Sequence, residues 1–168
     1  MARDASRESP LWSECLRPDH EREFVAVFSP LAEGRFALGI ETIYEGYLAH
    51  YGRPRLFAPP SEKTALLLGD YLYAHGLVRI AEMGSVEAVR DLAELISLCA
   101  HLQASSANPP DGAVWAATAA LLARGELDGA RAALRDRGDA RGLEGLAREH
   151  AGAAAVEQAF VAHAARLR

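Results

Sequence analysis

Hydrophobic residues recur with a helical period in the middle of the chain. Residues 62–83 are apolar around most of the helical circumference, which predicts a helix buried on several sides. Residues 85–104 form a single apolar stripe with the i, i+3, i+4, i+7 spacing of an amphipathic helix. Ser61 and Ser85 stand at the N-cap positions. Because only Gly84 and Ser85 separate the two stretches, they are predicted to pack antiparallel at the centre of a helical bundle.

Shorter helical patterns flank this central pair. The apolar spacing predicts further helices at 19–28, 36–51, 113–124, 127–137, 141–150 and 153–167. The segment 53–60 holds three prolines, which cannot continue a helix interior, and 105–112 reads SSANPPDG, a loop. No stretch shows the strict alternation of a β-strand. The predicted fold class is all-α: one helical domain over 19–168, preceded by a flexible N-terminal arm over 1–18.

Length, charge and cysteine content narrow the class of protein. A chain of 168 residues fits one domain. The net charge of -5 and the scattered basic residues argue against a nucleic-acid surface, because phosphate contacts need clustered Lys and Arg. Cys15 and Cys99 form no short-spaced framework, which indicates a reduced, cytoplasmic setting. The polar N-terminus lacks a signal-peptide core, and no apolar run reaches the ~20 residues that span a bilayer.

Few side chains point to chemistry by themselves. Arg53 and Arg55 in the proline-rich segment offer phosphate contacts, although a solvated loop is the commoner setting for such residues. His75 and His101 have no carboxylate or second histidine at ligand spacing, which favours ordinary core or surface histidines. The sequence contains no Ser–His–Asp or Cys–His arrangement and no glycine-rich phosphate loop. We therefore expect no catalytic residue, no resident metal and no cofactor.

One segment resembles a known family. Residues 51–74 read YGRPRLFAPPSEKTALLLGDYLYA, in which Gly52, Arg53 and Pro54 are followed by Gly69-Asp70-Tyr71-Leu72. This resembles the trans-polyprenyl diphosphate synthases, where an Arg-Arg-Gly-(Lys/Arg)-Pro turn precedes a helix with a Gly-Asp-x-Leu signature. The likeness extends over about residues 36 to 104, less than half of the chain. It implies a helical bundle like part of the isoprenoid synthase fold.

The family's metal-binding aspartates have no clear counterparts here. In the family, two Asp-rich motifs hold magnesium ions that neutralise a diphosphate, which requires several converging oxygen ligands. Aligned without a gap, the first motif falls on Glu41, Thr42 and Glu45; with a gap, it is deleted, and both readings stay open. The sequence contains no Asp-Asp pair. Glu41 and Glu45 are relict metal candidates, although solvated charges on a helix face are the more common outcome.

Three functions follow as hypotheses. The resemblance implies a non-catalytic small or regulatory subunit of a hetero-oligomeric synthase, which supports a catalytic subunit and its product chain length. Its partner is that catalytic subunit or a second copy of the chain. The alternatives are an unrelated helical protein-interaction domain and a minimal magnesium-dependent prenyl transferase or terpene synthase. In the subunit hypothesis, Arg53 and Arg55 lie near a diphosphate, and the partner interface consists of Leu68, Tyr71, Leu72, Leu92, Leu95 and Ile96.

Overall fold

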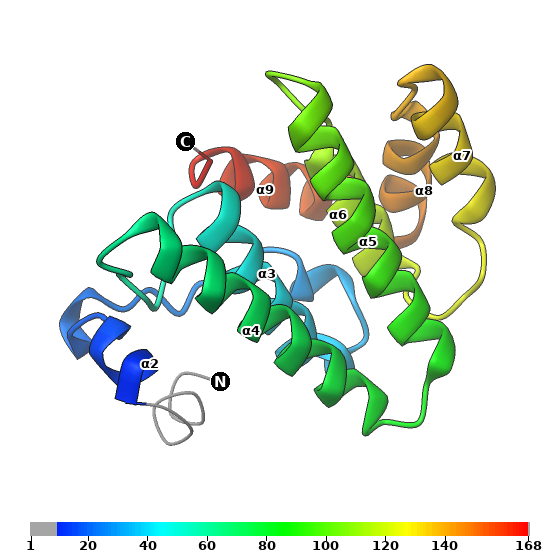
Figure 1. Cartoon of the computed structure of the whole chain (residues 1–168). Coiled ribbons are helices and arrows are strands. Elements are labelled where there is room, and N and C mark those ends of the chain that lie inside the picture. Colours follow the sequence, from blue (N-terminus) through cyan, green and yellow to red (C-terminus); the bar gives the residue numbers. More distant parts are fainter. Residues whose placement is uncertain (1–9, 168) are drawn as a thin grey trace.

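The computed structural model describes residues 10–167, apart from the Leu11 side chain, and every regular element within them is a helix (Figure 1). In order these are α2 (Pro10–Cys15), η1 (Asp19–Glu21), η2 (Ser29–Leu31), η3 (Gly34–Phe36), α3 (Ala37–Tyr51), α4 (Glu62–Ala81), α5 (Val86–Ser105), α6 (Asp111–Ala120), α7 (Asp128–Arg137), α8 (Arg141–Ala151) and α9 (Ala153–Ala164). Two isolated β-bridges form no sheet in this region. The all-α prediction is confirmed.

The two long helices begin at their predicted caps. The Ser61 hydroxyl accepts a hydrogen bond from the backbone N–H of Thr64 at 3.2 Å, at the start of α4. The Ser85 hydroxyl accepts one from the backbone N–H of Ala88 at 3.2 Å, at the start of α5. Each cap satisfies one of the donors that a helix N-terminus leaves unpaired, so these starts are encoded locally.

Paired glycines bring α3 and α4 into close antiparallel contact. Gly39 and Gly46 lie seven residues apart on α3 (46 − 39 = 7), and Gly69 and Gly76 lie seven apart on α4 (76 − 69 = 7). A Cβ at Gly46 would lie 2.9 Å from the carbonyl oxygen of Gly69, and one at Gly76 would lie 3.1 Å from that of Gly39. The two backbones therefore approach to a distance that only glycine allows.

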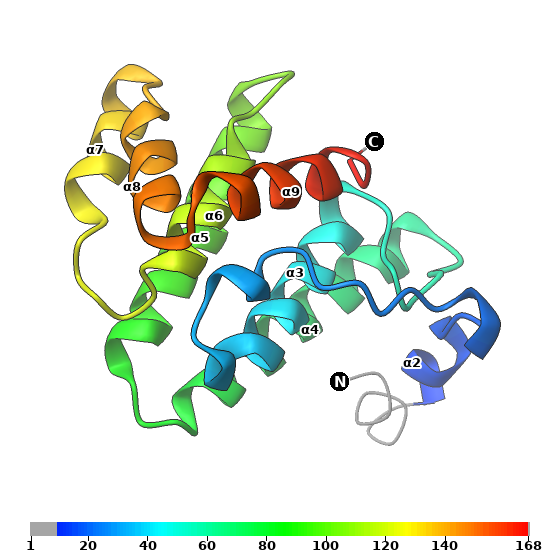
Figure 2. The ribbon, with the colours of Figure 1, turned by 180° about the vertical axis from the view of Figure 1, so that it is seen from behind.

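This contact differs from the predicted central pair. α4 lies along α3, whereas α4 and α5 diverge from the turn at residues 82–85 (Figures 1 and 2). α5 contains no glycine, so it cannot offer α4 the same close approach. The turn at residues 82–85 determines only where α5 begins. The glycines of α3 and α4 determine which helix lies beside α4.

The main core surrounds α6, which contacts α5, α8 and α9. Trp115 of α6 stacks on Phe28, with ring centroids 5.4 Å apart, and meets the edge of Tyr44 at 5.1 Å. A buried ion pair attaches α7 to this core: Arg131 donates to the Asp91 carboxylate of α5 at 2.8 Å. Cys99 is buried in the same core.

Part of the predicted N-terminal arm docks on the domain. Trp12 and Cys15 of α2 join Leu68 and Leu72 of α4 in a second, smaller apolar cluster. The Trp12 ring lies against Tyr71 with centroids 5.1 Å apart. Residues 1–9, the rest of the predicted arm, lie outside the described residues. α2 therefore covers the part of α4 that carries Leu68, Tyr71 and Leu72.

The helix predicted at 19–28 is wrong beyond its first turn. Only η1 is helical there, and the chain then runs extended to residue 26. The backbone groups of this segment find partners outside it: Glu23 N–H donates to the Arg55 carbonyl at 3.2 Å, and Val27 N–H donates to the Glu41 carboxylate at 3.0 Å. Because these bonds replace helical ones, the segment lies extended across α3.

None of the helices in the described part of the chain combines the length and the apolarity that crossing a bilayer requires.

The glycine contact predicts a large cost for a single methyl group. We expect Gly46→Ala to destabilise the fold by about 1–3 kcal/mol, because the new Cβ meets a backbone oxygen that can move only with α4. Gly145→Ala in α8 is the matched control, since its Cβ would meet nothing within 4 Å. That variant should be neutral or up to about 1 kcal/mol more stable. Urea denaturation of both variants measures the difference; equal stabilities would refute the close packing.

Candidate functional site

A buried charge cluster lies against α3 and consists of Glu41 and Glu45 of that helix and Arg55 of the loop that follows it. The two glutamates lie one helical turn apart, and the loop after α3 brings Arg55 over them. The Arg55 guanidinium donates from Nη1 to Glu41 Oε2 at 2.6 Å and from Nε to Glu45 Oε2 at 2.9 Å. It also lies over the Tyr44 ring, 5.0 Å from the centroid. Arg55 and Glu45 are buried, and the Glu41 side chain is 14% exposed.

The remaining carboxylate oxygens are also engaged. Glu41 Oε1 accepts hydrogen bonds from the backbone N–H groups of Val27 and Ser29, each at 3.0 Å. Glu45 Oε1 accepts one from Leu56 N–H at 2.7 Å. Every oxygen of the two carboxylates therefore has a donor from the chain itself, as buried charges require.

This cluster corrects two expectations. Glu41 and Glu45 are not solvated charges on a helix face, because Arg55 and three backbone amides enclose them. Arg55 is not part of a solvated loop, because its guanidinium is buried and points back to α3. The i, i+4 spacing of the glutamates was visible in the sequence, but nothing there indicated that an arginine ten residues later would fold between them.

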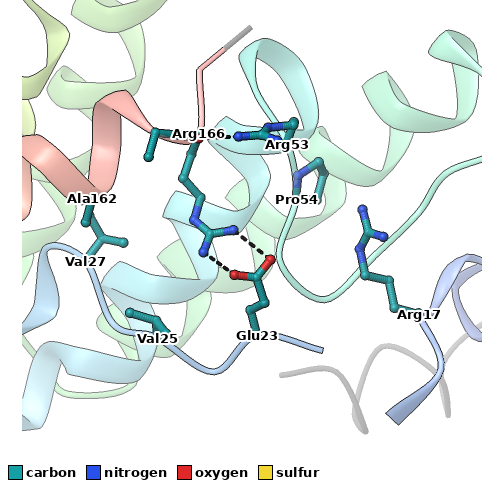
Figure 3. Close-up of a pocket in the computed structure, with 9 residues that line it drawn as sticks. Arg17, Glu23, Val25, Val27, Arg53, Pro54, Ala162 and Arg166 are labelled. Carbon is teal, nitrogen blue, oxygen red and sulfur yellow. Dashed lines mark hydrogen bonds and ion pairs between the residues drawn. The ribbon is translucent and has the colours of Figure 1, made fainter. Parts of the chain in front are cut away.

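Arg53 has a different setting, on the wall of a surface pocket of about 540 Å³ (Figure 3). Arg17 and Arg166 also line this pocket, and each of the three arginines comes from a different segment. The Arg53 guanidinium donates to the Ala165 carbonyl at the end of α9. The structure therefore separates the two arginines that the sequence placed together: Arg55 faces inward and Arg53 faces solvent.

Glu23 lies inside this pocket and pairs with Arg166. The two side chains form a double hydrogen bond, with Arg166 Nη1 to Glu23 Oε1 at 3.1 Å and Nη2 to Oε2 at 2.5 Å (Figure 3). Hydrogen bonding from Arg166 lowers the pKa of the Glu23 carboxyl, and the charges of Arg166, Arg17 and Arg53 lower it further. All three arginines thus act on one carboxylate.

A buried polar network joins α3, α5, α6 and α9. His163 Nδ1 lies 2.9 Å from the Tyr44 hydroxyl, and His163 Nε2 lies 3.3 Å from Asp111 Oδ1. Tyr47 donates to the other oxygen of Asp111, and Gln103 donates to the same oxygen at 3.0 Å. Both ring nitrogens of His163 are occupied, so this arrangement holds helices together and leaves no nitrogen free to accept a substrate proton.

Nothing in the amino-acid sequence indicated this network. Asp111 follows two prolines at the end of a predicted loop, and His163 lies 52 residues later in the last helix. Burial raises the pKa of the Asp111 carboxyl, but hydrogen bonds from His163, Tyr47 and Gln103 outweigh it, and the net pKa is lowered. Burial also raises the pKa of the Tyr44 and Tyr47 hydroxyls well above their usual value.

The predicted interface residues divide between core and surface. Within the chain itself, Leu68 and Leu72 pack against α2 and the loop after α3, and the main core contains Leu92 and Leu95. The partly exposed members are Tyr71 and Ile96. Exposed apolar side chains on α4 are instead Leu66, Leu67 and Val78.

Neither candidate histidine lies in a metal cluster. His75 is stacked on Tyr71, with ring centroids 5.3 Å apart, and its Nε2 lies 3.4 Å from Arg79 Nη2. His101 is on the exposed side of α5. In the part of the chain that the structure describes, no three His, Cys, Asp or Glu side chains are grouped to hold a metal ion.

Comparison with protein-family models, with curated proteins and with solved structures finds no match.

The charge cluster predicts that Arg55 is essential to the fold. We expect Arg55→Met to lower the free energy of unfolding by about 3–5 kcal/mol, because two carboxylates would stay buried without their cation. Arg141→Met is the control, because Arg141 is exposed and forms a surface ion pair with nearby Asp139. That change should stay within about 0.5 kcal/mol. Chemical denaturation compares the two, and an unaffected Arg55→Met variant would contradict the structural role.

The lowered pKa of Asp111 predicts a pH-dependent contribution to stability. A carboxylate with a depressed folded pKa stabilises the fold above its usual value of 3.8, and the contribution is lost as the pH falls through the folded pKa. We expect Asp111→Asn to cost about 1–3 kcal/mol near pH 6. The difference from wild type should shrink on acidification. Thermal melts of wild type and variant, from pH 6 down to below the usual carboxyl pKa of 3.8, measure this difference, and exposed Asp136→Asn is the control. A stability difference that does not change with pH would contradict the lowered pKa of Asp111.

Proposed function

We propose that the chain is a non-catalytic helical subunit that supports a catalytic polyprenyl diphosphate synthase and its product chain length. The observation that carries the proposal is the Glu41–Arg55–Glu45 cluster. The ungapped alignment places the family's first metal motif on this turn of α3, and there a guanidinium from the chain itself neutralises both carboxylates.

The cluster disfavours the magnesium-dependent enzyme. Magnesium needs several oxygen ligands in nearly octahedral geometry. Here each carboxylate oxygen already accepts a hydrogen bond, and releasing Arg55 would break a buried ion pair at a cost of about 3–5 kcal/mol. The carboxylates serve the fold in this arrangement. A subunit that keeps the family's helices and leaves the chemistry to a partner has no need of metal ligands.

The outer surface of α4 supplies the surface for a partner. Leu67, Ala74 and Val78 are exposed and recur at i, i+7 and i+11, which places them on one face of the helix. The exposed fractions of Leu67 and Val78 are 48% and 54%. Exposed apolar side chains that share one helix face favour a protein interface. This face differs from the predicted one, because Leu68, Leu72, Leu92 and Leu95 are already buried inside the chain.

Association should therefore depend on the outer face of α4. We expect Val78→Glu, and separately Leu67→Glu, to weaken binding to a catalytic synthase subunit about tenfold or more, since each loses the burial of one apolar side chain. Val161→Glu is the matched control, because Val161 is 64% exposed and belongs to α9, a helix that lies behind α5 in Figure 1 and in front of it in Figure 2. Co-expression, co-purification and titration measure the affinities, and circular dichroism checks that each variant remains helical.

The outcomes separate the candidate functions. Equal loss in Val161→Glu would contradict the α4 interface. A chain that self-associates through α4 and ignores every synthase would favour a homo-oligomeric interaction domain instead. The isolated chain, given magnesium, an allylic diphosphate and isopentenyl diphosphate, should form no elongated product. Turnover by the isolated chain would reject the non-catalytic proposal.

A further inference from the structure

The pocket of Figure 3 has a composition that the proposed partner surface on α4 does not explain. Its charged lining residues are Arg17, Arg53, Arg166 and Glu23, so the formal charge of the wall is positive, with three cations against one anion. This contrasts with the net charge of -5 of the whole chain. A volume of about 540 Å³ falls in the range of small-molecule sites. The pocket concentrates positive charge on an acidic protein.

Three distant parts of the chain converge on this pocket. Arg17 follows α2, Arg53 lies in the turn after α3, and Arg166 follows α9. Backbone hydrogen bonds fix two of these segments together, because Arg53 N–H donates to the Arg166 carbonyl at 2.9 Å. The Arg53 and Arg166 backbones are therefore held beside each other before a ligand arrives, which reduces the entropy lost on binding.

The Glu23 carboxylate forms hydrogen bonds with one of the three arginines that line the pocket. Each oxygen of this planar carboxylate accepts a hydrogen bond from the guanidinium of Arg166, so the pair is bidentate. The Arg53 guanidinium donates to a carbonyl, and Arg17 lies 3.9 Å from Glu21, an exposed and weak pair. A group with three acceptor oxygens in a tetrahedral arrangement suits arginines approaching from different directions better than a carboxylate does.

We propose that this pocket binds the phosphate group of a small phosphate monoester, with Glu23 as the internal anion that the ligand displaces from Arg166. The rest of the wall is apolar and includes Val25, Val27, Pro54 and Ala162. These residues fit a short apolar group attached to the phosphate. The site is independent of the α4 surface, so its failure would leave the proposed partner interaction untouched.

Calorimetric titration with n-butyl phosphate tests the proposal, with inorganic phosphate and pentanoate as comparison ligands. We expect butyl phosphate to bind most tightly. Pentanoate should bind at least about tenfold more weakly, because its carboxylate accepts from fewer guanidiniums. Binding should weaken as salt is added. No detectable binding of butyl phosphate at about 10 mM in low salt, or equal affinity for pentanoate, would overturn the proposal.

Variants locate the binding in this pocket. Arg53→Gln should weaken butyl phosphate binding about tenfold, and Glu23→Gln should strengthen it by a similar factor, because the internal competitor is gone. The matched controls are Arg141→Gln and Asp139→Asn, which break an exposed pair elsewhere on the protein and should change nothing. If Arg141→Gln weakens binding as much as Arg53→Gln does, the ligand binds through general charge, and the assigned site is wrong. Thermal melts confirm that each variant is folded.

Discussion

The close approach of α3 and α4 at four glycines sets the frame on which the rest of the structure is built. Where Gly46 faces Gly69 and Gly76 faces Gly39, the backbones meet with no room for a Cβ. This contact fixes the register of the two helices. It also points the opposite side of α3 toward Trp115 and the remaining core, because one face of α3 is committed to α4.

Charged groups organise the other faces of α3. Arg55 returns from the loop to join Glu41 and Glu45, and the Glu41 carboxylate also holds the N-terminal segment by accepting from the backbone N–H groups of Val27 and Ser29. One cluster thus ties an N-terminal segment, a helix and a loop together. Burying two carboxylates without partners would cost several kcal/mol of folding free energy, so the fold requires both the Arg55 guanidinium and the backbone amides at this position. Residues that resemble a metal site in the sequence serve here as the anchor of the fold.

The surface divides into two regions with different chemistry. The outer side of α4 is apolar at Leu67 and Val78, which suits a protein partner. The pocket between the N-terminal segment, the loop after α3 and the end of α9 is lined by arginines, which suits an anion. The two proposed sites lie on different elements, so each can be altered without changing the other.

The sequence by itself determined the local features: the all-α class, the caps at Ser61 and Ser85, and the approximate limits of α3 to α9, because helical periodicity and capping depend on residues close in the chain. It could not determine which helix lies beside α4, since the glycine pairs act only across two facing helices. Nor could it show the charge cluster, which depends on how the loop after α3 folds back, or the Asp111–His163 network, whose members are far apart in the chain. Only the tertiary structure decided whether Glu41, Glu45 and Arg55 face water, a metal or one another, because burial and pairing of charges depend on every segment that packs around them.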